Sequence, residues 1–267
     1  MDTFERGRIA PSAVISDFAE IGQRVTIGAF SVIHPGVRLG DDSVVGSHCV
    51  LGEPTAAFYD GSAEDEIIPC SIGDSSVIRS HTVIYQGVGA GPGLRTGHRA
   101  TIREGSIMGE DVQIGSMADL QGALTIGSHA RLHSNVFVGS LSTVEEFAWL
   151  FPFVVLTNDP HPPSDTCTVG PVIRRYAAVG ANSLVMSGVE VGEHSLVGAM
   201  SLVTRDVEPE TVVVGVPAKP IGSVRDVRCR HGALEHVYPW PVQFRRGYPD
   251  GVLPAPETFS SLGHGDH

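Results

Sequence analysis

An aliphatic residue recurs at every sixth position through most of this chain. Residues 9–50 divide into the hexads IAPSAV, ISDFAE, IGQRVT, IGAFSV, IHPGVR, LGDDSV and VGSHCV, each of which begins with Ile, Leu or Val. The period resumes at Ile72 and runs, with one long interruption, to Val203. A helix would repeat about every 3.6 residues and a strand about every 2, so neither period explains the pattern. A fixed longer period instead predicts stacked repeats that share one continuous core.

Each hexad has the composition of one short strand and a turn, and three hexads would complete a triangular coil. We expect the aliphatic residue to point into the core and the small residue two positions before it to lie at a crowded corner. Gly often follows the aliphatic residue, and because Gly tolerates positive φ it would relieve the turn. These hexads resemble those of the hexapeptide-repeat family. The resemblance implies a left-handed parallel β-helix, an exception to the usual right-handed crossover rule, over about residues 9–222.

We therefore expect an all-β fold with two parts: a β-helix domain, residues 1–222, and an irregular or helical C-terminal extension, residues 223–267. Two breaks in the period predict loops. Residues 53–71 are acidic and irregular, and residues 157–172 contain four prolines and cannot form a strand. The Gly-rich segment 84–102 keeps the six-residue spacing, so it should continue the coil. A short helix is expected over residues 223–237.

Composition narrows the classes of function. The net charge of −12 argues against broad nucleic-acid binding, which needs Lys and Arg along the phosphates. An anionic substrate would need a local basic patch, and the C-terminal third offers Arg174, Arg175, Arg205 and Lys219, the only lysine. No signal-peptide core is present, and no apolar stretch reaches the roughly 20 residues of a membrane helix. We expect a cytoplasmic protein with no membrane partner. Its four cysteines lack CxxC spacing and are expected to be reduced.

The segment VGVPAKPI, residues 214–221, resembles the terminal coil of acetyl-CoA-dependent hexapeptide transferases. That resemblance implies an acyl-CoA, most simply acetyl-CoA, as co-substrate, and no metal. It places Lys219, and more weakly Arg205, near the CoA phosphates, where an ammonium group serves as a point charge. The alternative is that the motif only caps the β-helix. The residues whose backbone N–H groups are expected to bind the pantetheine amides are Gly180, Ala181, Gly198 and Ala199.

Two further segments, RLHSNVFVG at 131–139 and FPFVVLTNDPHPPS at 151–164, resemble the active-site strips of hexapeptide transferases that acylate nucleotide-linked amino sugars. In that family the sites lie in clefts between the subunits of a homotrimer, so the resemblance implies a homotrimer here. The residues expected to act in catalysis are His133, Asn135 and Asp159, and those expected to bind the acceptor are Asn158, His129 and His161.

The expected chemistry is direct attack of an amine on a thioester carbonyl. The amine must lose a proton, and a His with a pKa near neutrality can accept it. Asn side chains or backbone N–H groups can hold the oxyanion that develops on the carbonyl. Asp159 could instead orient the ammonium group and relay its proton. His133 could also be an ordinary surface histidine of the β-helix.

The sequence is also compatible with other functions. Residues 72–87 and 102–106 also resemble the UDP-N-acetylglucosamine acyltransferase family of lipid A synthesis, but the catalytic His position of that family falls on Gly122 here. The further alternatives are O-acetylation, transfer to another small amine, a metal protein resembling the γ-class carbonic anhydrases, and a non-catalytic trimeric scaffold. His129 and His133 do not have the spacing of the carbonic anhydrase ligands, so an acyl-CoA-dependent N-acyltransferase is the preferred interpretation.

Overall fold

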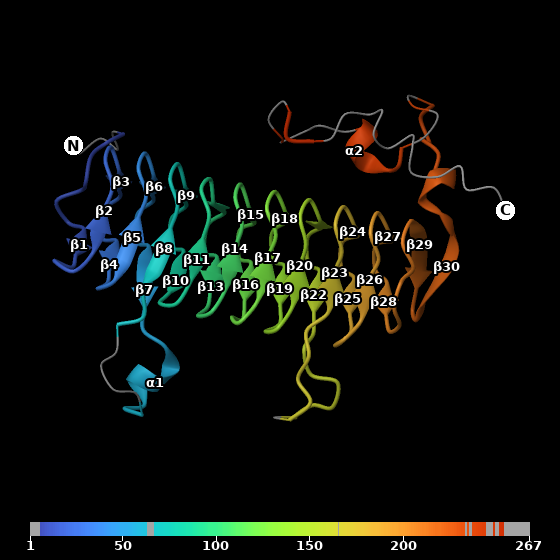
Figure 1. Cartoon of the computed structure of the whole chain (residues 1–267), viewed down its shortest axis with the longest axis horizontal. Helices are drawn as coiled ribbons and strands as arrows, with labels where there is room; N and C mark the ends of the chain where they lie inside the picture. Colours follow the sequence, from blue (N-terminus) through green and yellow to red (C-terminus); the bar gives the residue numbers. More distant parts are fainter. Residues whose placement is uncertain are drawn as a thin grey trace.

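A computed structural model describes residues 6–62, 67–164, 166–232, 234, 237–243, 248 and 251–253. The described chain winds into a long three-sided prism of parallel β-sheets, the left-handed β-helix that the hexads predict (Figure 1). From β1 to β28, consecutive strands belong to different sheets, and strands that are three apart in the sequence pair with each other. Each hexad thus supplies one strand and the turn that leads to the next face.

The three sheets are named here by their number of strands. The ten-strand face comprises β1 (Val14–Ile15), β4 (Val32–Ile33), β7 (Val50–Glu53), β10 (Val83–Tyr85), β13 (Thr101–Ile102), β16 (Asp119–Leu120), β19 (Phe137–Val138), β22 (Val155–Leu156), β25 (Leu184–Val185) and β28 (Leu202–Val203). The nine-strand face comprises β2 (Glu20–Ile21), β5 (Val37–Leu39), β8 (Cys70–Ile72), β11 (Gly89–Ala90), β14 (Ile107–Met108), β17 (Thr125–Ile126), β20 (Thr143–Val144), β23 (Val172–Ile173) and β26 (Glu190–Val191). The eleven-strand face comprises β3 (Thr26–Ile27), β6 (Val44–Val45), β9 (Val77–Ile78), β12 (Arg95–Thr96), β15 (Gln113–Ile114), β18 (Arg131–Leu132), β21 (Trp149–Leu150), β24 (Ala178–Val179), β27 (Leu196–Val197), β29 (Thr211–Gly215) and β30 (Ala218–Ser223).

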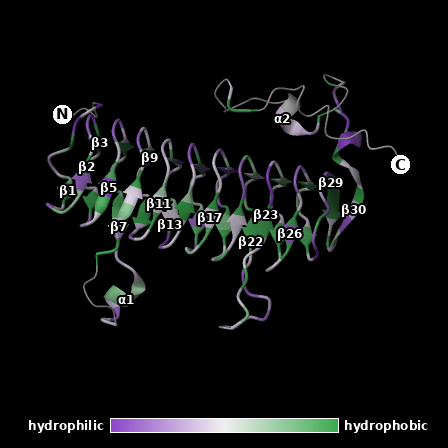
Figure 2. Cartoon of the chain, viewed as in Figure 1, coloured by the Kyte–Doolittle hydropathy of each residue, from purple (hydrophilic) through white to green (hydrophobic). Residues whose placement is uncertain are grey.

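The aliphatic column forms the core, as the sequence predicts. Its residues stack on their counterparts one coil away, and Ile84, for example, pairs with Ile102. Both side chains are fully buried. The small residues two positions earlier, such as Ala100 and Ala148, are buried as well. Hydropathy follows this plan, because the apolar residues concentrate in the strands and the polar ones in the turns (Figure 2).

The role expected of Gly after the aliphatic residue is wrong. The positive φ falls two positions later and usually on another residue, such as Arg24 (φ 55°) or Asn135 (φ 59°). Gly is needed for a different reason, which is close approach between coils. A Cβ on Gly46 would lie 2.6 Å from the Ser80 nitrogen of the next coil, closer than atoms can pack. Side chains at this Gly position therefore mark places where the coil departs from its usual packing.

Both predicted loops leave the edge between the ten-strand and nine-strand faces. The first joins β7 to β8 and contains α1 (Ala56–Tyr59); the second joins β22 to β23. Figure 1 shows both on the same side of the prism. The segment 84–102 continues the coil through β11 and β12, which confirms that prediction.

The C-terminal end of the prism is a hairpin and not a further coil. VGVPAKPI forms part of an antiparallel hairpin, β29–β30, that closes the eleven-strand face. The helix expected over 223–237 is only a 3-10 turn, Val224–Asp226, in the described part of that range. The extension then passes to α2 (Trp240–Gln243) on the side of the prism opposite the two loops (Figure 1). No helix of the described residues is both long and apolar enough to cross a membrane.

Candidate active site

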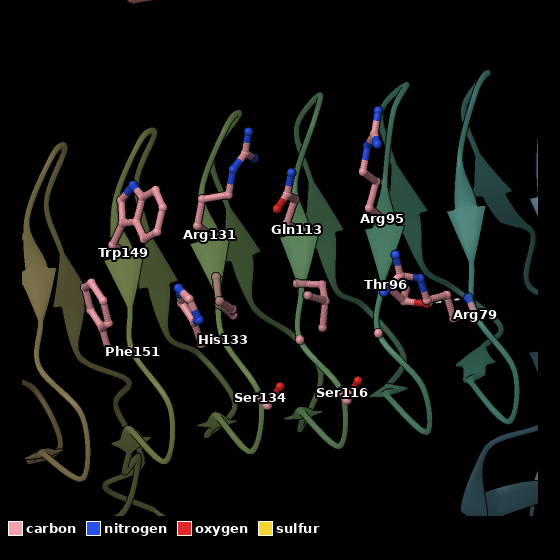
Figure 3. A pocket seen from close by; sticks show the side chains of 14 residues that line it. Arg79, Arg95, Thr96, Gln113, Ser116, Arg131, His133, Ser134, Trp149 and Phe151 are labelled. Atoms are coloured by element: carbon pink, nitrogen blue, oxygen red, sulfur yellow. Dashed lines mark hydrogen bonds between the residues drawn. The ribbon is translucent and has the colours of Figure 1, made fainter. Parts of the chain in front are cut away.

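A groove of about 600 Å³ lies on the outer side of the eleven-strand face, across β9, β12, β15, β18 and β21. Two kinds of residue line it: outward-pointing strand residues, and the residues that directly follow the aliphatic column. Figure 3 shows Trp149, Arg131, Gln113 and Arg95 in one row across successive coils, with Phe151, His133 and Arg79 in a second row below it. The lining residues are Arg79, Arg95, Thr96, Gly97, Gln113, Ile114, Gly115, Ser116, Arg131, Leu132, His133, Ser134, Trp149 and Phe151.

His133 lies at the aromatic end of this groove. Its ring stacks on Phe151 at 5.1 Å between centroids and packs against Trp149 at 5.6 Å. It occupies the position where the preceding coil carries Gly115, so its side chain enters a column that is otherwise mostly Gly. Burial against these rings lowers the pKa of His133 from its usual value. The imidazole is therefore neutral at pH 7 and can accept a proton.

The cations of the groove are not those that the sequence suggested. Arg79 and Arg95 are exposed there, and among the described residues neither forms an ion pair with a carboxylate. Arg131 is buried, and its guanidinium binds Asp111 at 2.7 Å. The expected C-terminal patch is partly neutralised, because Arg174 pairs with Glu145 and Glu190, at 2.7 and 2.6 Å, and Arg175 lies 3.9 Å from Glu146.

His129 does not share the groove with His133. It lies at the edge between the nine-strand and eleven-strand faces, where its ring stacks on Phe147 at 4.8 Å. Glu110 and Asp111 approach its two nitrogens, each at 3.4 Å. Its side chain is only 12% exposed, so an acceptor in the groove would not reach it within one chain.

Asn135 lies in the turn after β18 and outside the residues that line the groove. Its positive φ places it in the left-handed region, which Asn tolerates better than most residues. Its backbone N–H donates to the carbonyl of Ser116, 2.9 Å away in the preceding coil. The turn alone accounts for an Asn here, and its catalytic role stays a prediction.

Asn158, Asp159 and His161 belong to the loop between β22 and β23. The Asn158 amide donates to the Ser140 hydroxyl at 2.7 Å. The Asp159 carboxylate accepts the backbone N–H groups of His161 and Ser164, both at 2.8 Å, and so organises the loop. His161 is exposed. Because this loop leaves the edge opposite the eleven-strand face, one chain does not bring it to His133.

The expected cofactor residues divide between two faces. Gly180 and Gly198 follow β24 and β27, so they occupy the same column as His133 in later coils of the eleven-strand face. Lys219 is exposed on β30 at the end of that face. Arg205 follows β28 of the ten-strand face and is not brought near Lys219 by the fold. Ala181 is half-buried and Ala199 exposed in the turns after the two glycines.

Sequence reasoning missed Arg79, Arg95, Gln113, Trp149 and Phe151. Two signals could have identified them. Arg79, His133 and Phe151 interrupt a Gly column on one face, and Arg95, Gln113 and Trp149 stand directly before the aliphatic residue on that same face. Counting hexads in threes would have gathered both sets.

Comparison with known proteins supports the repeat. Residues 18–53 match the family model "Bacterial transferase hexapeptide (six repeats)", and residues 177–205 match "Hexapeptide repeat of succinyl-transferase". The Bifunctional protein GlmU of Mycobacterium tuberculosis (strain ATCC 25177 / H37Ra) is 27% identical over 191 residues, 71% of this chain and 35% of that protein. GlmU of Thermotoga sp. (strain RQ2) is 28% identical over 195 residues, 72% of this chain and 39% of that protein. Two segments of the chain thus match hexapeptide-repeat models, and the chain spans little more than a third of these relatives.

Solved structures of similar proteins include LpxA from Acinetobacter baumannii, with a TM-score of 0.44 and 22% identity over 80% of this chain and 74% of that one. Serine acetyltransferase in complex with coenzyme A from Brucella abortus strain S19 has a TM-score of 0.35 and 29% identity, over 38% of this chain and 40% of that one. Both TM-scores are low, so no property of either structure is carried over to this chain.

Proposed function

We propose that this protein is an acyl-CoA-dependent N-acyltransferase, most simply an acetyltransferase, that acts on a nucleotide-linked amino sugar. The observation that carries the proposal is the groove on the eleven-strand face, in which a half-buried, neutral His133 lies between aromatic rings and exposed arginines. The match of residues 18–53 to a model described as a bacterial transferase hexapeptide supports the reaction class.

His133 is the general base of the proposed reaction. The sugar amine attacks the thioester carbonyl while His133 accepts the proton that the nitrogen loses. The tetrahedral intermediate then collapses, the carbon–sulfur bond breaks, and the proton passes from His133 to the departing CoA thiolate. The products are an amide and free CoA, and the histidine returns to its neutral form. No covalent acyl-enzyme is needed.

Arg79 and Arg95 support an anionic acceptor. Guanidinium groups bind phosphate oxygens through charge-assisted hydrogen bonds, and both are exposed at the end of the groove away from Phe151. In a chain with a net charge of −12, a run of cations on one face is a specific local feature. A sugar joined to a phosphate would place its anion on the arginines and its amine toward His133.

The acyl-CoA is proposed to follow the same face toward the C-terminal end. Gly180 and Gly198 continue the His133 column, and their lack of side chains leaves the backbone accessible to a pantetheine arm. Lys219, exposed on β30, would meet a CoA phosphate. Lys219→Ala is then expected to raise KM for acyl-CoA more than KM for the acceptor; equal changes in both would remove Lys219 from this role.

A homotrimer is part of the proposal, and the ten-strand face supports it. Its outward residues are mostly Val, Leu and Phe, and they remain half-exposed in the single chain. Such an extended apolar surface marks an interface. In the trimer, the loop that carries Asn158, Asp159 and His161 would come from a neighbouring subunit to the groove, with Asn135 at its rim.

The test is release of CoA thiol from acetyl-CoA with a panel of nucleotide-linked amino sugars, alongside calorimetry of CoA binding. We expect thiol release with at least one amino sugar, and none with the matching hydroxyl sugars. Release with no acceptor of the panel, together with no CoA binding, would overturn the proposal.

A further inference from the structure

The C-terminal extension packs against the same edge of the prism that carries two groove residues, Arg131 and Trp149. Trp240 and Tyr248 of the extension are 7% and 8% exposed, and their rings stack on each other at 5.7 Å. The Trp240 indole N–H donates to the carbonyl of Tyr176 at 2.9 Å. The extension is thereby fixed to the edge between the nine-strand and eleven-strand faces.

Tyr248 of the extension contacts both Trp149 and Arg131. Its hydroxyl accepts the indole N–H of Trp149 at 2.8 Å and donates to the carbonyl of His129 at 3.1 Å. The centroid of its ring lies 4.4 Å from the guanidinium carbon of Arg131, which also binds Asp111. One side chain thus contacts both groove residues of this edge.

Trp149 lies between Tyr248 and His133 and contacts both. Its ring packs against His133 at 5.6 Å and against Phe151 at 5.8 Å, so the indole is a wall of the aromatic end of the groove. A Trp ring with only these contacts could turn about its side-chain bonds, because the outer side of the groove is open to solvent. The hydrogen bond from its N–H to Tyr248 fixes one orientation.

We propose that Tyr248 is a positioning residue of the groove: it orients Trp149 and Arg131 so that the acceptor is held against His133. This inference rests on the proposed function, and it assigns the extension a part in acceptor binding that the hexads alone would not provide. Tyr248 does not touch the reacting atoms and supplies no proton to them.

The test is Tyr248→Phe, which keeps the ring stacking and the cation–π contact but removes both hydrogen bonds. KM for the acceptor should rise about five-fold, the effect of one neutral hydrogen bond, while kcat and KM for acyl-CoA stay within about two-fold. Tyr238→Phe is the matched control, because Tyr238 packs in the same aromatic cluster and, among the described residues, forms no hydrogen bond with Trp149 or Arg131. It should leave all three constants unchanged. Equal KM values for the two variants would overturn the proposal.

A second readout separates this proposal from the acyltransferase itself. The only two tryptophans of the chain are Trp149 and Trp240, which meet at 5.9 Å, so tryptophan fluorescence reports on the surroundings of these two rings. Tyr248→Phe should shift the emission of Trp149, measured in a Trp240→Phe background, and Tyr238→Phe should not. If the wild type releases no thiol with any acceptor, the proposed function fails, and the emission decides the orienting role of Tyr248. An unchanged emission in Tyr248→Phe would then overturn that role.

Discussion

The ten-strand and eleven-strand faces are built from the same hexad, yet they present different surfaces. The residue before the aliphatic column points outward on both. On the ten-strand face it is Val83, Phe137 or Val155; on the eleven-strand face the corresponding strands carry Arg95 and Trp149. The inward aliphatic column forms the core of the prism whichever residue type occupies the outward position. The outward position is therefore free to specify an interface on one face and a binding groove on the other.

The largest effect is expected from a charge placed on the apolar ten-strand face. Phe137→Asp should dissociate the trimer, because a carboxylate buried in an apolar interface costs several kcal/mol. Sedimentation should show monomers, and these should have little activity because the proposed site includes a neighbour's loop. Thr125→Asp on the exposed strand β17 of the nine-strand face is the control and should remain trimeric. A wild type that is itself monomeric would contradict the interface.

Removing the cations of the groove should affect kinetics without affecting assembly. The double substitution Arg79→Ala and Arg95→Ala should raise KM for the acceptor by roughly ten-fold to a hundred-fold, as expected for two charge-assisted hydrogen bonds that are weakened by exposure to solvent. The trimer should persist. Arg38→Ala on the nine-strand face, where Arg38 pairs with Glu20 at 3.2 Å, is the matched control and should change KM little. An effect on KM no larger than that of the control would remove the arginines from acceptor binding.

A smaller effect is expected in the pH dependence of kcat, which tests how burial changes the pKa of His133. Burial lowers the pKa of His133, so the imidazole loses its proton at a lower pH than an exposed histidine does. The kcat profile should therefore keep its value as the pH falls from 7 and decline only below about 6.5, the usual pKa of His. Opening the aromatic wall with Trp149→Ala should move this decline to higher pH. A decline at or above 6.5 in the wild type would contradict the assignment.

The hexad predicted the fold because it places one residue type at one position of every strand. The aliphatic column, the two loops and the continuity of segment 84–102 all follow from this spacing. The hairpin β29–β30 could not be predicted in the same way, because Val214 and Lys219 pair across a turn that has no hexad register. The docking of Trp240 and Tyr248 depends on contacts about a hundred residues apart in the chain, such as that between Trp149 and Tyr248.

The candidate site was only partly predictable. The sequence identified His133, and its column position relative to Gly180 and Gly198 follows from counting coils. His129 has the same residue type but lies at an edge that the extension covers, which no local pattern indicates. The residue type at Asn135 does not indicate a function, because a turn with positive φ favours Asn whether or not the residue has one. The proposed approach of the Asp159 loop to the groove involves a second copy of the chain, which the hexads of one chain do not describe.

The most direct test of the account is the kcat of His133→Gln, measured by CoA thiol release with both substrates saturating. Gln preserves much of the volume and polarity of the side chain but cannot act as a base. His48→Gln, at an exposed histidine of the edge between the eleven-strand and ten-strand faces, is the control. We predict that kcat falls about 100-fold or more in His133→Gln, in a protein that is still trimeric, and is unchanged in the control. A kcat within a few-fold of wild type would contradict the claim that acyl transfer takes place at this groove.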